Sequence, residues 1–209
     1  MIQFGVAPRT AIATNMVVLV LMSLGSSLGF RGQEMGSTRR IGRLVAVTIV
    51  GSVAGALLML RLPEAVLRAL VPGAMIAILL FLLVQPRPAK LPHPALGYGA
   101  ALLLAVYGGL FSGGYVIMLV AAFTYFFGYA FLPSIALARL LNAASASVAT
   151  AVFAFHGAVD WKLGGLLGGV ALVASFFGAR LAKKVPETWL RRLFTGAVAL
   201  LALKSLFEL

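Results

Sequence analysis

The pattern Pro-Glu-x-x-Leu-Arg occurs twice, as Pro63-Glu-Ala-Val-Leu-Arg68 and as Pro186-Glu-Thr-Trp-Leu-Arg191. The copies lie 123 residues apart, and at the same interval Gly55-Ala56 matches Gly178-Ala179. Long apolar segments surround both copies. A repeated boundary inside a hydrophobic chain indicates a membrane protein built by duplication, and such duplications are typical of transporters.

The boundary itself has a simple interpretation. Proline at the first turn of a helix costs no hydrogen bond, because the N–H at that position has no intrahelical partner. The glutamate that follows meets the positive end of the helix dipole. We interpret both copies as helix starts, with a role in gating as the alternative.

The composition requires a lipid environment. Of 209 residues, 62% are hydrophobic and only 11% are charged, where soluble domains carry roughly 25%. The mean hydropathy is +1.06, and a soluble core cannot bury so much apolar surface. The net charge of +12 does not indicate nucleic-acid binding, because the basic residues cluster between apolar segments, where topology needs them.

Eight apolar segments follow one another along the chain, and each is long enough to span a membrane or nearly so at about 1.5 Å per residue. They cover 10–30, 41–60, 66–84, 95–111, 115–132, 134–155, 163–181 and 189–207. The sequence therefore predicts an all-α polytopic membrane protein with about eight transmembrane segments, forming a single membrane domain over residues 1–209.

The connection between the fourth and fifth segments is rich in glycine and carries no charge. It contains Gly108, Gly109, Ser112, Gly113 and Gly114. A loop in water normally carries polar residues. We therefore expect this connection to lie inside the protein at membrane depth, as a broken helix or a re-entrant turn.

Basic residues predict the orientation in the membrane. If all segments cross, eleven of them share one side: Arg31, Arg39, Arg40, Arg43, Arg87, Lys90, Arg180, Lys183, Lys184, Arg191 and Arg192. The other side has Arg9, Arg61, Arg68, Lys162 and Lys204. The positive-inside rule makes the first side cytoplasmic and places both observed termini outside. The predicted location is the cell inner (plasma) membrane, as a multi-pass protein.

The repeat pairs segments one, two and three with six, seven and eight. Five crossings separate the partners, so we expect the halves (1–90 and 95–209) to be inverted across the membrane. Asn15 matches Asn142 after a four-residue adjustment. Segments four and five have no counterpart before segment one. We therefore expect a first half that lacks its N-terminal segments, through a shortened N-terminus or a chain that begins upstream of Met1.

Several short motifs resemble the sulfite exporter TauE/SafE family of bacterial membrane proteins. Gly5-Val-Ala-Pro8 followed by Ala11-Ile-Ala-Thr14-Asn15 is similar to the family's G-x-x-x-x-x-A-x-x-T-S signature, with Asn15 where serine is frequent. The run from His156 to Trp161 resembles its G-x-[VI]-D-W loop. The Gly-rich segment with which the family usually begins is missing here. The resemblance implies movement of small anions such as sulfite, sulfonates and related organic acids.

Charges within the apolar segments point to a candidate site. We place the five acidic residues at or near a membrane surface, which disfavours cation transport; they are Glu34, Glu64, Asp160, Glu187 and Glu208. Arg139 lies inside the sixth segment, and Asn142 shares its helix face at i+3. A guanidinium and an amide on one face can bind an oxyanion. The alternative is that Arg139 extends to the cytoplasmic interface.

Four further residues complete the candidate substrate site. Asn15 and Asn142 occupy equivalent places and can approach each other near the pseudo-twofold axis, or simply form interhelical hydrogen bonds. Thr14, next to Asn15, is a less specific candidate. Gly113 and Gly114 can free backbone N–H groups at the start of a half-helix, where an anion is favoured. Close packing is the alternative role for these glycines.

The predicted function is that of a membrane transporter for small anions. The alternative is a non-transporting or truncated membrane subunit of the same family. An enzyme is not expected, because the chain has no H-E-x-x-H motif, no paired aspartates within spans and no cysteine. His93 and His156 are isolated and make no metal site, and no cofactor is expected. The expected partners are a small anion and the lipid bilayer, with the oligomeric state left open.

Overall fold

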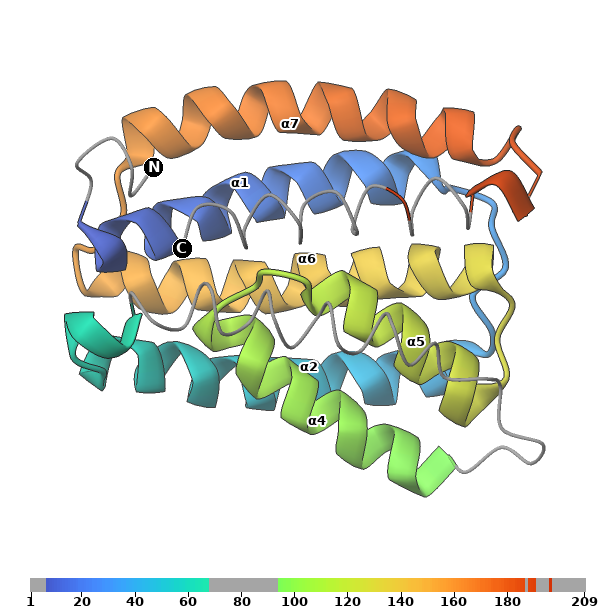
Figure 1. The fold of residues 1–209 in the computed structure, drawn as a ribbon, viewed down its shortest axis with the longest axis horizontal. Helices are drawn as coiled ribbons and strands as arrows, with labels where there is room; N and C mark the ends of the chain where they lie inside the picture. The colour runs from blue at the N-terminus through green and yellow to red at the C-terminus, as the bar shows by residue number, and fades with distance from the viewer. Residues whose placement is uncertain (1–6, 68–93, 187, 191–195, 197–209) are drawn as a thin grey trace.

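The computed structural model describes residues 7–67, 94–186, 188–190 and 196. The secondary-structure elements in these ranges are α-helices (Figure 1). They are α1 (Pro8–Gly29), α2 (Thr38–Arg61), α4 (Pro94–Leu110), α5 (Tyr115–Phe127), α6 (Phe131–Phe155) and α7 (Trp161–Ala182). The all-α prediction is confirmed. Among the described residues, four helices, α1, α2, α6 and α7, are long and apolar enough to cross a membrane. Most of the predicted segments 66–84 and 189–207 lies outside the described residues.

Both Pro-Glu boundaries start helices in the same way. The Pro63 carbonyl accepts hydrogen bonds from the N–H groups of Val66 and Leu67, at 3.0 and 3.1 Å. The Pro186 carbonyl accepts from Trp189 and Leu190, also at 3.0 and 3.1 Å. The interpretation of the repeated boundary as a helix start is therefore confirmed.

The helices that correspond in the two halves run in opposite directions. In Figure 1, α1 and α7 run from left to right, whereas α2 and α6 run from right to left. The repeat interval is kept at the helix starts, because Ser37 caps α2 and Asp160, 123 positions later, caps α7. Since α1 corresponds to α6 and α2 to α7, the arrangement is the one that inverted repeats require.

Replacing the Asp160 cap is expected to destabilise the protein. Its carboxylate accepts a hydrogen bond from the Leu163 N–H at 2.9 Å, and loss of such a cap costs about 1 kcal/mol. Asp160→Ala should therefore lower the melting temperature in detergent, and Asp160→Asn should retain most of it. Lys162→Ala, at an exposed neighbour, is the control. Equal melting temperatures for Asp160→Ala and Lys162→Ala would contradict the role of the cap.

Glycines bring two pairs of helices close together. A Cβ on Gly25 of α1 would lie 2.2 Å from the Leu172 carbonyl oxygen of α7. A Cβ on Gly55 of α2 would lie 1.9 Å from the Val106 carbonyl oxygen of α4. Such approach of backbones is how helices pack tightly in lipid. Gly178 of α7 is the repeat equivalent of Gly55, and a Cβ there would meet no described atom within 4 Å.

Helices α4 and α5 form a hairpin whose open end lies at one end of the bundle (Figure 1). The Tyr98 ring near the start of α4 meets the Phe127 ring at the end of α5, with centroids 5.5 Å apart. With 13 residues, α5 is about 20 Å long, shorter than a hydrocarbon core of about 30 Å. The hairpin therefore has the geometry of a re-entrant element, one of the two forms predicted for the glycine-rich connection. This corrects the expectation that segments four and five each cross the membrane.

The expected fifth segment, 115–132, is corrected by the structure. Helix α5 ends at Phe127 because Gly128 adopts the left-handed conformation, with φ of 68°, and caps it. Leu132 belongs to the next helix, which begins at Phe131. Glycine adopts this conformation without steric cost. Because the α4–α5 hairpin starts and ends at the same end of the bundle, the shorter α5 does not change the direction in which any other helix runs.

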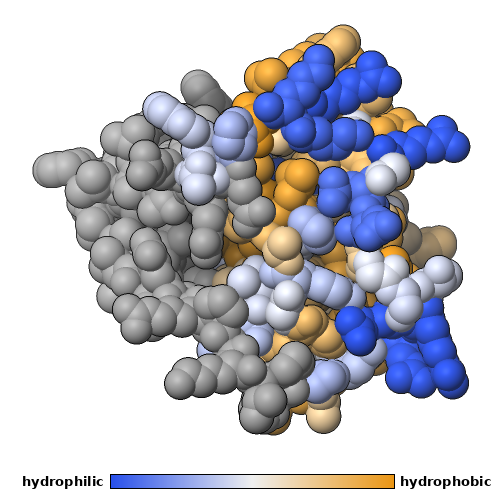
Figure 2. Space-filling view, turned by 90° about the vertical axis from the view of Figure 1, so that its right-hand side faces the viewer, coloured by the Kyte–Doolittle hydropathy of each residue, from blue (hydrophilic) through white to orange (hydrophobic). Residues whose placement is uncertain are grey.

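Basic residues gather at the end of the bundle where α1 and α7 end and α2 begins. Figure 2 shows this end, with hydrophilic residues over much of its described surface. The residues near these helix ends are Arg31, Arg39, Arg40, Arg43, Arg180, Lys183 and Lys184. Several are anchored: Lys183 Nζ donates to the Arg31 carbonyl at 3.1 Å, and Arg40 donates to the Tyr129 hydroxyl at 3.0 Å. These seven residues belong to the side predicted to be cytoplasmic.

Candidate functional site

The tip of the α4–α5 hairpin is built from Ser112, Gly113 and Gly114. Gly114 precedes α5 in the left-handed conformation, with φ of 73°, and provides no side-chain cap. The Tyr107 hydroxyl donates to the Gly113 carbonyl and closes the turn. Glycine at these positions allows the chain to reverse with little bulk. Helix α5 therefore begins with backbone N–H groups that no side chain caps.

Asn142 is held at this tip. Its amide Nδ2 donates to the Ser23 hydroxyl of α1 at 2.6 Å, and its Oδ1 accepts from the Ser112 hydroxyl at 3.1 Å. Asn142 is 1% exposed and lies near the middle of α6. The hairpin tip therefore reaches the depth of the middle of a spanning helix. We call Ser23, Ser112 and Asn142 the asparagine cluster.

The electrostatics of the asparagine cluster favour an anion. The first N–H groups of a helix lack intrahelical partners, and the N-terminus of α5 carries the positive end of its dipole. Among the acidic residues in the described ranges, Glu34 lies in the loop after α1, Glu64 follows Pro63 at a helix start and Asp160 caps α7. None of these three carboxylates lies within a spanning helix, so none of them would compete for the donors.

A second group of polar side chains lies next to the first and was not predicted. Ser52 of α2 donates to the Ser145 hydroxyl of α6 at 2.7 Å. The Tyr115 hydroxyl lies beside those of Thr48 and Ser145. Gly108 makes room for the tyrosine, because a Cβ there would lie 3.0 Å from the ring. We call Thr48, Tyr115 and Ser145 the hydroxyl cluster.

Two hydroxyls of this cluster are unpaired. Within the described residues, neither the Thr48 nor the Tyr115 hydroxyl reaches a hydrogen-bond partner, although both residues are 0% exposed. Leaving a buried polar group unsatisfied costs about 1–3 kcal/mol. A sequence signal existed: Thr48 and Ser52 share a helix face at i+4, and Asn142 and Ser145 share one at i+3.

The structure places Arg139 one turn from Asn142 on α6, half-buried and nearer the basic end. Its side chain forms no hydrogen bond or ion pair with the described residues, in contrast to Arg40 at the helix boundary. Arg139 is therefore close in sequence and depth to the asparagine cluster without joining it. Gly113 and Gly114 do belong to the tip that contacts Asn142 through Ser112.

The other two predicted residues lie away from Asn142. Thr14 is buried and its hydroxyl accepts from the Asp160 N–H at 3.0 Å, which ties α1 to the start of α7. Asn15 is half-buried on α1. Ser23, which does bind Asn142, lies about 12 Å further along the same helix. The structure therefore does not bring Asn15 and Asn142 together.

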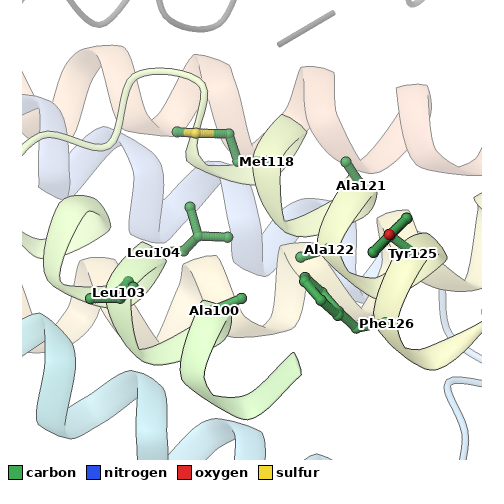
Figure 3. A pocket seen from close by; sticks show the side chains of 8 residues that line it. All are labelled: Ala100, Leu103, Leu104, Met118, Ala121, Ala122, Tyr125 and Phe126. Atoms are coloured by element: carbon green, nitrogen blue, oxygen red, sulfur yellow. The ribbon is translucent and has the colours of Figure 1, made fainter. Parts of the chain in front are cut away.

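A groove of about 440 Å³ lies elsewhere, between α4 and α5 (Figure 3). Apolar side chains dominate its lining, which consists of Ala100, Leu103, Leu104, Met118, Ala121, Ala122, Tyr125 and Phe126. It provides no charged donor for an anion. In the described part of the chain, no three His, Cys, Asp or Glu residues come together as a possible metal site. The polar clusters are therefore the better candidate for the functional site.

Comparison with known proteins places these features in context. The family model described as sulfite exporter TauE/SafE matches residues 1–205. The probable membrane transporter protein YfcA of Escherichia coli (strain K12) is 29% identical over 187 residues, covering 87% of this chain and 68% of the relative. A probable membrane transporter protein of Haemophilus influenzae is 22% identical over 214 residues, covering 100% of this chain and 84% of the relative. No solved structure matches significantly.

Proposed function

Because the chain belongs to the sulfite exporter TauE/SafE family, a family of membrane transporters rather than enzymes, we propose that it carries a small anion. The proposed substrates are sulfite, sulfonates or related organic acids. The observation that supports this choice best is the asparagine cluster, in which Asn142 joins α1 and α6 to the start of α5. Its donors are neutral, and the helix dipole adds partial positive charge.

The proposed binding step exchanges hydrogen bonds within the asparagine cluster. The Ser112 hydroxyl and the Asn142 amide turn from each other toward the oxygens of the arriving anion. The Ser23 hydroxyl, which accepts from Asn142, has its own proton to donate. Backbone N–H groups at the start of α5 add further donors. Binding thus replaces protein–protein hydrogen bonds by protein–anion hydrogen bonds, which are stronger when one partner is charged.

The path to the cluster is proposed to begin at the basic end of the bundle. Arg31, Arg180 and Lys183 raise the local concentration of anions there. Arg139, one turn before Asn142 on α6, would then attract the anion partway between the basic end and the asparagine cluster. Rocking of the inverted halves about the cluster would then expose it alternately to each side. In this proposal the basic end faces the cytoplasm of a cell whose inner membrane holds the protein.

Uptake into liposomes tests the proposed function directly. The purified chain should take up labelled sulfite or a labelled alkanesulfonate in a saturable manner, and labelled sodium should not enter. Protein-free liposomes are the control for leakage. Rates equal to those of protein-free liposomes for every anion offered would contradict the proposal and favour a non-transporting subunit.

A further inference from the structure

The hydroxyl cluster contains more hydrogen-bond donors than the protein uses. Thr48 and Tyr115 come from α2 and α5, and both hydroxyls lack a partner among the described residues. Ser145 of α6 accepts the proton of Ser52 at 2.7 Å, so its own proton remains available. Three helices therefore bring two unpaired hydroxyls and one hydroxyl that only accepts a hydrogen bond to one place in the interior.

Packing alone does not explain this arrangement. Buried polar groups in native proteins are nearly always paired, and unpaired ones require an explanation. The three hydroxyls lie close enough to interact, yet within the described residues neither the Thr48 nor the Tyr115 hydroxyl has a partner with full hydrogen-bond geometry. Phenylalanine and valine would fill the same space without leaving a polar atom unpaired. The hydroxyls are therefore better explained by a ligand that accepts their protons.

We propose that Thr48, Tyr115 and Ser145 form a second anion site, which coordinates one oxygen of an oxyanion or a halide through three hydroxyl donors. The proposal rests on the proposed function, because this would be a second binding site on the path that the transported anion follows. Asn142 and Ser145 are neighbours at i+3 on α6, and Ser112 and Tyr115 flank the glycine pair of the hairpin tip. The two clusters are therefore adjacent.

The chemistry of the site selects the class of anion. The three donors are neutral, and burying a multiply charged ion without a countercharge is strongly unfavourable. The site therefore suits a singly charged anion such as bisulfite, nitrate or chloride. All three side chains are 0% exposed, so the anion enters only when α5 separates from α2 and α6.

Removing the hydroxyls while keeping the side-chain shapes tests the proposal. The variants are Thr48→Val, Tyr115→Phe and the double variant, and the probes are sulfite near pH 7, nitrate and chloride. Each single variant should raise the half-saturating concentration for sulfite uptake by about tenfold, the effect of losing one hydrogen bond to a charged group. In the absence of anions, each should melt at or above the temperature of the unmodified chain.

Thr150→Val is the matched control, because the Thr150 hydroxyl is also buried and unpaired within the described residues but belongs to neither cluster. It should leave the half-saturating concentration unchanged. Half-saturating concentrations for Thr48→Val and Tyr115→Phe equal to that of Thr150→Val would overturn the proposal. So would melting temperatures that fall in parallel with uptake, since that result indicates a structural role.

Anion-dependent melting separates this site from the proposed function. The probes should raise the melting temperature of the unmodified chain, and the double variant should lose most of the rise. This measurement remains decisive if sulfite is not transported at all, because it does not depend on uptake. An equal rise in the double variant, or no rise with any of the three anions, would overturn the second site.

Discussion

Replacing Asn142 with alanine is expected to lower the rate of sulfite uptake by about tenfold or more. The substitution removes the amide that would donate to the anion and leaves the Ser23 and Ser112 hydroxyls without their shared partner. It also removes the hydrogen bond that joins the hairpin tip to α6. The measurement is the initial rate of uptake into liposomes, normalised to the amount of protein inserted.

Two further variants make this result specific. Ser147→Ala changes an exposed hydroxyl on the same helix and should leave uptake unchanged. Asn142→Asp keeps the shape of the side chain but introduces negative charge, so it should abolish uptake of anions more completely than alanine does. Undiminished uptake by both Asn142 variants would remove the asparagine cluster from the transport path.

Gly55→Ala is expected to destabilise the protein more than any other single methyl group added to α2. The new Cβ would lie 1.9 Å from the Val106 carbonyl oxygen and 2.8 Å from the Leu110 nitrogen, both of them backbone atoms that cannot turn aside. Helices α2 and α4 must then separate. Overpacking of this kind costs about 1–3 kcal/mol, occasionally more. The measurement is the melting temperature in detergent, together with the yield of monodisperse protein.

The repeat supplies the matched control for this substitution. Gly178→Ala places the same methyl group at the equivalent position of α7, where no described atom lies within 4 Å. Alanine has the higher helix propensity, by up to about 1 kcal/mol, so this variant should melt at or above the temperature of the unmodified chain. A similar loss of stability in both variants would show that close approach to α4 is not the cause.

Apolar segments and their boundaries allowed most of the fold to be predicted from sequence. Segment length and hydropathy placed α1, α2, α6 and α7, and the Pro63 and Pro186 boundaries gave the repeat interval that the helix caps Ser37 and Asp160 also keep. The uncharged glycine-rich stretch indicated the hairpin tip. The end of α5 was missed because Gly128 lies inside an apolar run, and only its left-handed conformation shows that the helix stops there.

The composition of the polar interior was harder to predict. Ser23, Thr48 and Ser145 are single small polar residues in apolar helices, and helix periodicity alone does not say which of them meet. In the sequence, Tyr115 is only the first residue of an apolar segment. Asn142 was predicted because an amide within an apolar helix is unusual. Its partners could not be predicted, because Ser23 and Ser112 lie 119 and 30 residues earlier in the sequence. Such contacts depend on tertiary packing.

The re-entrant hairpin also has a consequence for the order in which the protein is made. Ser112 finds its partner Asn142, and Tyr115 its neighbour Ser145, only in α6, which leaves the ribosome after both hairpin helices. Until then the tip carries polar groups that lipid cannot satisfy. Because segments of a nascent chain settle as their contacts become available, α4 can pack against α2 early, whereas the polar groups of the tip meet their partners only once α6 is in place. Membrane insertion of the first helices and completion of the polar interior are therefore separate events in biogenesis.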